Sequence, residues 1–350
     1  MLKRLLPAVL LLASPLLAQP APAPVSDKID VNVVLLDAIV TDSRGNQILG
    51  LGPDDFIVRE KSVAQHVDSA DYFTNRKLLN GREQDAAFPV ERVHEARYVV
   101  FFFDKPNSNE VSRSIIQARH DLVRFLDSSM APDDRIAVVG HDVRLKVYTD
   151  FTSDKTQLRH ALDEATSFSR GRMQASDGPG SGPSILRSVD LDRMMNRTGT
   201  VFEALQVLAD ALRNIRARKD LVLFSAGIIG PDQDVRGGMI LSRSRYYAPA
   251  TDALNRANVA IYAITLQVSE VPEYVHQNLA SLAADTNGQY FRYHTSFTTP
   301  LRQIEKNSGG YYLISYRPQS RDGKGFQKVD VSLKNPEFRV KARAGYSYGE

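Results

Sequence analysis

A run of six apolar residues that ends at an aspartate constrains the fold more than any other feature of the sequence. Residues 98–103 read YVVFFF and are followed directly by Asp104. A strand that is apolar at every position has both faces buried, which is the environment of a parallel sheet covered by helices. Further short apolar runs predict strands at residues 136–139, 143–148, 221–224, 259–265 and 289–292.

Apolar residues at helical spacing occur between these runs. One stripe consists of Val111, Ile115, Ala118, Leu122 and Phe125, and a second consists of Val201, Leu205, Leu208, Ala209, Leu212 and Ile215. Both stripes are interpreted as helix faces that pack on the core. Strand and helix patterns that alternate over residues 97–306 predict an α/β domain with an open, mostly parallel sheet and helices on both faces, a Rossmann-like arrangement.

The two flanks of this domain have strand patterns instead. Residues 27–93 contain candidate strands at 29–40, 56–60 and 65–73, and the turn sequence Asp42-Ser-Arg-Gly-Asn46. Residues 309–350 contain candidate strands at 311–316, 329–333 and 338–342. Each set is too small to bury a core alone, so we expect the two flanks to pack into one β-sandwich. Residues 75–88 are interpreted as a linker, and residues 169–197 as a long mobile loop.

The amino terminus has the three parts of a secretory signal. Lys3 and Arg4 precede an apolar stretch at residues 5–18, and a Pro/Ala-rich linker at residues 19–26 follows. The apolar stretch is shorter than the roughly 20 residues of a membrane-spanning helix. We therefore expect cleavage after Ala18 and a secreted or periplasmic protein. An uncleaved signal anchor is the alternative, against which Pro7 and Pro15 argue.

Charge and cysteine content exclude several classes of function. The chain has 44 basic and 41 acidic side chains, a net charge of +3. Removal of residues 1–18 takes away Lys3 and Arg4 and leaves 42 basic and 41 acidic side chains. The resulting net charge of +1 argues against a nucleic-acid binder. The absence of cysteine excludes disulfides, thiolate metal sites and cysteine nucleophiles. The seven histidines lack the spacing of a metal-ligand motif, and His141 is expected on the surface in a tight turn.

Candidate functional residues follow the predicted strands. In an open α/β sheet, ligands bind beyond the carboxyl ends of the strands. The residues expected there are Asp104-Lys-Pro-Asn-Ser108 after the first central strand, Ser225-Ala-Gly227 after a later one, and Thr198-Gly-Thr200 before the second amphipathic stripe. Each has a purely structural alternative: Ser108 and Thr198 or Thr200 could cap helices, and Asp104 could form an ion pair with Lys105 or an arginine.

Short segments spread over the mature chain carry a family resemblance. These are residues 40–45 (VTDSRG), 98–104, 150–152 (DFT), 219–227 (KDLVLFSAG), 257–262 (ANVAIY), 286–288 (TNG) and 312–316 (YLISY). In this order they resemble the von Willebrand factor type A domain and, more narrowly, the VWFA-related proteins of Acidobacteria. The resemblance implies an α/β domain that binds another protein at the sheet edge.

The resemblance also implies a divalent cation, Mg²⁺ or Mn²⁺, at a metal-ion-dependent adhesion site. The matching ligands are Asp104, Ser108 and Thr200. The match is partial, because Pro106 replaces a serine of the family motif and Ala226 an aspartate. So few charged ligands predict a weak or absent metal. Residues of the implied partner-binding face are Asp104, Asn107, Ser108, Thr198, Thr200 and Ser225.

The sequence therefore predicts an exported, non-catalytic interaction or adhesion protein with a degenerate metal site, whose partner is another protein rather than nucleic acid or membrane. A metal-independent scaffold subunit of an envelope complex is one alternative. A hydrolase that uses Asp104 is another, although no residue pair resembles a nucleophile with its base. The Arg-rich residues 236–245 could contact an acidic partner or form a solvated loop.

Overall fold

The protein is described here by a computed structural model, which covers residues 33–73, 96–105, 111–167, 183–215, 217–228, 246–266, 273–292, 296–318, 325–343 and 345–348. Several predictions fall outside these residues: the signal at 1–18, the linkers at 19–26 and 75–88, and the Arg-rich segment at 236–245. No helix among the described residues combines the length and the apolar character that a membrane span requires.

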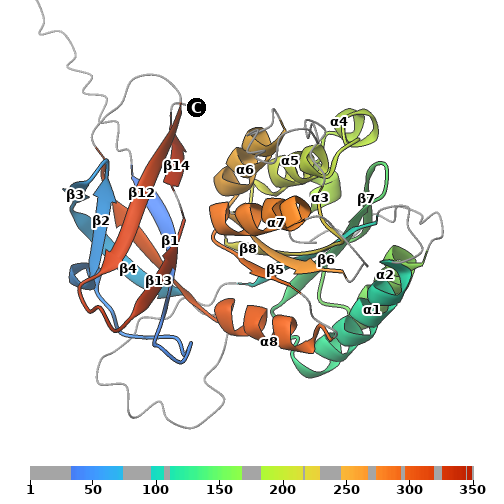
Figure 1. The fold of residues 1–350 in the computed structure, drawn as a ribbon, viewed down its shortest axis with the longest axis horizontal. Coiled ribbons are helices and arrows are strands. Elements are labelled where there is room, and N and C mark those ends of the chain that lie inside the picture. Colours follow the sequence, from blue (N-terminus) through green and yellow to red (C-terminus); the bar gives the residue numbers. More distant parts are fainter. Residues whose placement is uncertain are drawn as a thin grey trace, which may run out of the picture. The chain divides into compact units, whose positions relative to one another are not determined.

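A six-stranded sheet forms the centre of the α/β domain (Figure 1). Its strands, in spatial order, are β10 (Gln289–Phe291), β9 (Val259–Thr265), β8 (Lys219–Ser225), β5 (Tyr98–Asp104), β6 (Arg135–His141) and β7 (Leu145–Thr152). All neighbours are parallel except β7, which returns antiparallel to β6 through a short turn. Strand order reverses beside β5, so the carboxyl end of β5 lies at the switch point where such sheets bind ligands.

Helices cover both faces of this sheet. One face carries α1 (Val111–Ser128), α2 (Lys155–Thr166) and α8 (Thr298–Asn307). The other carries α3 (Ile185–Ser188), α4 (Leu191–Asn196), α5 (Val201–Leu212), α6 (Tyr247–Arg256) and α7 (Glu273–Asp285). The predicted fold class is confirmed. The first predicted stripe lies on α1 and the second on α5, except for Ile215, which follows the end of α5 but packs in the same core.

The apolar run in β5 shows why the sheet must be covered on both sides. Val99, Phe101 and Phe103 pack in the core under α1 and α2, whereas Val100 and Phe102 pack in the core under α5. Alternate side chains of a strand point to opposite faces. Each of these five side chains is at most 4% exposed, so burial at every position requires a helical layer on each side.

The flanking strands form two antiparallel four-stranded sheets. The first, in spatial order, is β13 (Arg339–Ala342), β1 (Val34–Thr41), β11 (Tyr311–Tyr316) and β4 (Val67–Phe73). The second is β14 (Gly345–Tyr348), β12 (Gly325–Leu333), β2 (Phe56–Glu60) and β3 (Val63–Gln65), with a short 3-10 helix (Pro53–Asp55) before β2. Residues of both sheets share one apolar core, in which the rings of Phe56 and Tyr312 lie 5.3 Å apart. Each sheet combines strands from both ends of the chain, as expected for one composite sandwich.

The predicted loop at residues 169–197 is wrong in its second half, which contains α3 and α4. Asp150 at the end of β7 is the reason. Its buried carboxylate accepts hydrogen bonds from Ser184 Oγ at 2.5 Å, Ile185 N at 2.8 Å and Leu186 N at 3.1 Å. These bonds satisfy the free N–H groups at the start of α3, a long-range contact that local sequence patterns do not reveal. Residues 169–182 lie outside the described part of the chain.

Candidate functional site

The candidate site lies where β5, β6 and β8 end beside one another. Asp104, the last residue of β5, is in register with His141, the last residue of β6. Phe103 is in register with Phe224 of β8, which places Ser225 next to Asp104 on the other side. The sheet register therefore brings an acid, an imidazole and a hydroxyl together at one edge.

Asp104 and Ser225 are bonded directly to each other. Ser225 Oγ donates to Asp104 Oδ2 at 2.6 Å and accepts from the backbone N–H of Gly227 at 3.1 Å. The Ser225 side chain is fully buried, whereas that of Asp104 retains 14% exposure. This short bond places the Ser225 hydroxyl beside the Asp104 carboxylate.

His141 holds the other oxygen of Asp104. Its Nδ1 lies 3.4 Å from Asp104 Oδ1 and its Nε2 lies 2.9 Å from the carbonyl oxygen of Thr198. A carboxylate and a carbonyl can only accept hydrogen bonds, so both contacts are satisfied together only when both ring nitrogens carry protons. The arrangement therefore favours a buried imidazolium, with His141 only 6% exposed.

The charges around His141 act in the same direction. Burial favours the neutral ring, but the hydrogen bond and negative charge of Asp104, the Thr198 carbonyl and the Asp142 carboxylate outweigh it. Together they raise the pKa of His141 above its ordinary value of 6.5. The expectation of a surface position for His141 was wrong, because the residue is the last of a buried strand and not part of the following turn.

Thr198 and Thr200 have structural roles. The buried hydroxyl of Thr198 donates to the Met194 carbonyl at 2.8 Å and accepts from Leu145 N at 3.0 Å, so only its carbonyl faces the site. Thr200 caps α5: its Oγ accepts from Glu203 N at 3.2 Å, and its own N–H donates to the Glu203 carboxylate at 3.0 Å. This reciprocal pair is a capping box and confirms the capping alternative for Thr200.

Lys105 does not pair with Asp104. Its backbone N–H donates to the His141 carbonyl at 2.8 Å, and its Nζ donates to the Tyr148 hydroxyl at 3.1 Å. Burial lowers the pKa of Lys105, against an opposing effect of Asp142, with Lys146 adding to the decrease. Gly140 provides the space for this contact, since a Cβ at that position would lie 2.9 Å from the Tyr148 ring.

A second polar chain lies further along the same sheet. Thr265, the last residue of β9, is in register with Ser225. Its hydroxyl donates to the Tyr290 hydroxyl at 2.8 Å, and that hydroxyl lies 2.8 Å from Nδ1 of His276 on α7. None of these three residues was predicted as a site residue from the sequence, although Thr265 is recognisable as a polar residue that ends a buried strand.

The described residues do not fit a Mg²⁺ or Mn²⁺ ion. Both Asp104 oxygens are engaged, one by a hydroxyl and one by an imidazole whose geometry favours a positive charge. The Thr200 hydroxyl is bonded to Glu203, and Ala226 has no side-chain oxygen. Among the described residues there is no cluster of three or more histidine or acidic side chains that could hold a metal. Pro106, Asn107 and Ser108 lie outside the described residues.

Comparisons with known proteins give slight similarities. No protein-family model matches the chain, and no curated protein matches it at significance. An aerotolerance-related membrane protein from Bacteroides fragilis aligns at 11% identity and a TM-score of 0.38, over 60% of this chain and 98% of the other. BatB from Bacteroides thetaiotaomicron aligns at 14% identity and a TM-score of 0.37, over 61% of this chain and 98% of BatB. Proximal thread matrix protein 1 from the mussel byssus, with a zinc-occupied MIDAS motif, aligns at 12% identity and a TM-score of 0.38. The alignment covers 64% of this chain and 49% of the byssus protein.

Proposed function

We propose that the chain is a von Willebrand factor type A-related, non-catalytic interaction protein whose sheet edge works without a divalent cation. The observation that carries the proposal is the closed network Thr198 carbonyl–His141–Asp104–Ser225. In it an imidazolium supplies the positive charge next to Asp104 that a metal ion would otherwise supply. The proposal includes export, on the strength of the signal pattern at residues 1–18, and another protein as the partner.

The same geometry argues against the hydrolase alternative. A serine nucleophile needs its hydroxyl bonded to a base that can take its proton. Here Ser225 Oγ donates to Asp104, and the Nε2 of His141 is directed to a backbone carbonyl. Ser225 is also fully buried. The three residue types of a catalytic triad are present, but they are connected in an order that supports structure rather than proton transfer.

Thermal unfolding of the mature chain tests the metal-free part of the proposal. The protein is stripped with EDTA and then given millimolar Mg²⁺, Mn²⁺, Ca²⁺ or Zn²⁺, beside an Asp104→Ala variant. A cation bound only to the folded state at a hundredfold excess over its Kd would add about 2.7 kcal/mol, or roughly 5–10 °C in a domain of this size. We expect midpoints that agree within about 1 °C. A cation-dependent rise that Asp104→Ala removes would contradict the proposal.

The same preparation tests the interaction and the absence of catalysis. A protein captured from envelope extract is identified, purified and bound again in EDTA to the native chain and to Asp104→Asn. We expect EDTA to leave its Kd unchanged, Asp104→Asn to weaken binding about tenfold, and the partner to keep its mass on long incubation. Cleavage of the partner that Asp104→Asn abolishes would favour the hydrolase instead.

A further inference from the structure

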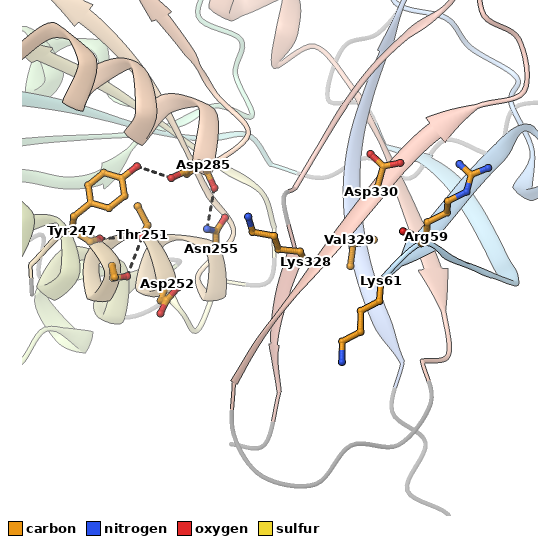
Figure 2. A pocket seen from close by; sticks show the side chains of 12 residues that line it. Arg59, Lys61, Tyr247, Thr251, Asp252, Asn255, Asp285, Lys328, Val329 and Asp330 are labelled. Atoms are coloured by element: carbon orange, nitrogen blue, oxygen red, sulfur yellow. Dashed lines mark hydrogen bonds between the residues drawn. The ribbon is translucent and has the colours of Figure 1, made fainter. Parts of the chain in front are cut away.

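A cavity of about 600 Å³ lies away from the sheet edge, between α6 of the α/β domain and the strands β2 and β12 (Figure 2). Its volume is within the range of small-molecule sites, which often occur at domain interfaces. None of the residues that form the Asp104 network lines it. Its walls come from distant parts of the chain, and the charges on these walls indicate what kind of ligand the cavity can bind.

One wall is basic. Arg59 on β2, Lys61 in the turn between β2 and β3, and Lys328 on β12 line it, with Asp330 as the acid on the same side. Three cations against one acid give this wall a net charge of +2. Lys61 and Lys328 are exposed, so their ammonium groups are available to a ligand.

The turn that carries Lys61 has an unusual backbone. Lys61 and Ser62 have φ values of 47° and 69°, the left-handed region that favours glycine. Non-glycine residues are strained in this region, and such strain concentrates at ligand-binding positions. A two-residue hairpin turn normally uses Asn-Gly or Asp-Gly. This chain instead places a lysine and a serine there, both of which line the cavity.

The opposite wall is acidic and contains an unsatisfied acceptor. Asp252 lines it on α6, and Asp285 at the end of α7 accepts from the Tyr247 hydroxyl at 2.6 Å. Asn255 Nδ2 donates to the Asp285 carbonyl at 3.0 Å, but its Oδ1 is buried with no hydrogen-bond partner among the described residues. Asn255 is 6% exposed, and the Lys328 side chain extends toward it in Figure 2.

Polar contacts hold the two walls together. Arg343, between β13 and β14, donates from Nη1 to the Asn255 carbonyl at 2.9 Å and from Nε to Asp37 Oδ1 at 2.6 Å. Asp37 also accepts from Arg218, next to β8. The cavity is therefore framed by specific polar contacts between the sandwich and the α/β domain.

We propose that this cavity binds a short zwitterionic peptide, with its carboxylate toward Lys61, Lys328 and Arg59 and its ammonium toward Asp252 and Asp285. An anion alone would face the acidic wall, and a cation alone would face the basic wall. A ligand with separated opposite charges complements both. Its N–H groups supply the donor that Asn255 Oδ1 lacks once the flexible Lys328 side chain turns to the ligand carboxylate. A buried acceptor left unpaired destabilises the protein, and such a ligand removes that cost.

Calorimetric titration and ligand-observed NMR with triglycine test this proposal on the full mature chain. We expect triglycine to bind with a Kd of about 1 mM or below, and N-acetyl-triglycine amide, which lacks both charges, to show no binding. Lys328→Gln and Asp252→Asn should each weaken triglycine about fivefold, the size of one exposed ion pair. Lys334→Gln and Asp192→Asn are matched controls, since both residues are exposed and neither lines the cavity.

Each of the following results would overturn the proposal: no triglycine binding at 10-fold above the expected Kd, equal binding of the blocked peptide, or affinities that Lys328→Gln and Asp252→Asn leave unchanged. Acetate that binds as tightly as triglycine would show a simple anion site and would also overturn it. None of these outcomes bears on the metal-free sheet edge, because the two sites share no residue.

Discussion

At the scale of single residues, the defining feature is a histidine in the place where a cation is expected. His141 joins Asp104 to the Thr198 carbonyl, and Ser225 completes the bonds of Asp104. A buried carboxylate needs a paired charge or several donors. This protein meets that need with its own side chains, so the charge of the site depends on the protonation of a histidine.

The stability of the fold should therefore depend on pH through His141. Its pKa is raised in the folded state, so its contribution is complete below its ordinary value of 6.5 and is lost as the pH rises through the folded value. We expect His141→Gln to lower the free energy of unfolding by about 1–2 kcal/mol at pH 5.5, and the deficit to shrink toward pH 9. Denaturant titrations of the native chain and of His141→Gln between pH 5.5 and pH 9 measure this difference in the free energy of unfolding.

His160→Gln is the control for this experiment. The His160 side chain is 67% exposed on α2 and lies 3.9 Å from Glu164, a surface contact worth at most about 1 kcal/mol. A deficit of His141→Gln that grows as the pH rises would contradict the imidazolium assignment.

At the scale of elements, helix starts are fixed by side chains that accept from free backbone N–H groups. Asp154 and Thr200 do this locally for α2 and α5, each from the position just before the helix. Asp150 accepts from the first N–H groups of α3, although it lies 34 residues before Ser184 in the sequence. Helix α3 has four residues, too few to be stable alone, so it depends on this distant carboxylate.

Asp150→Ala should therefore destabilise α3 and α4 in particular. It removes the acceptor of two backbone N–H groups of α3, of the Phe151 N–H and of one hydroxyl, and we expect a cost of about 2–4 kcal/mol. Limited proteolysis should then cleave faster within residues 183–197. Asp154→Ala removes a local cap and should cost about 1 kcal/mol without faster cleavage there. Equal cleavage of the two variants would refute the role of Asp150.

At the scale of the whole molecule, a buried ionic cluster connects the sandwich with the α/β domain. Asp37 on β1 accepts from Arg218, from Arg343 Nε at 2.6 Å and from Asn287 Nδ2 at 3.1 Å. Burial opposes its charge, but the two guanidinium groups outweigh burial and hold the pKa of Asp37 far below its ordinary range. The charge is therefore present at all pH values above about 4.

Removal of Asp37 should uncouple the two parts. Asp37→Ala leaves Arg218 and Arg343 without their shared carboxylate, and breaking a buried pair costs about 3–5 kcal/mol. Calorimetry should show one unfolding transition for the native chain and two for the variant. Asp127→Ala, which removes an exposed partner of Arg159, should cost less than about 1 kcal/mol. If both variants unfold alike, the cluster does not couple the domains.

The sequence alone determined the features that repeat at short intervals. The uninterrupted apolar run of β5 and the helical stripes of α1 and α5 predicted the covered parallel sheet, and Thr200 was one of the two threonines proposed to cap the second stripe. Asp104 and Ser225 were found because each ends a buried apolar run. These patterns need only the local geometry of a strand or a helix.

The tertiary structure alone decided which partners these residues take. His141 meets Asp104 across 37 residues and Thr198 across 57, Ser225 meets Asp104 across 121, and Arg218 meets Asp37 across 181. Such contacts follow from strand order and register, which local spacing does not specify. For that reason the sequence located the edge of the sheet and predicted a degenerate site with a weak or absent metal there, but not the imidazole that the folded chain places beside Asp104.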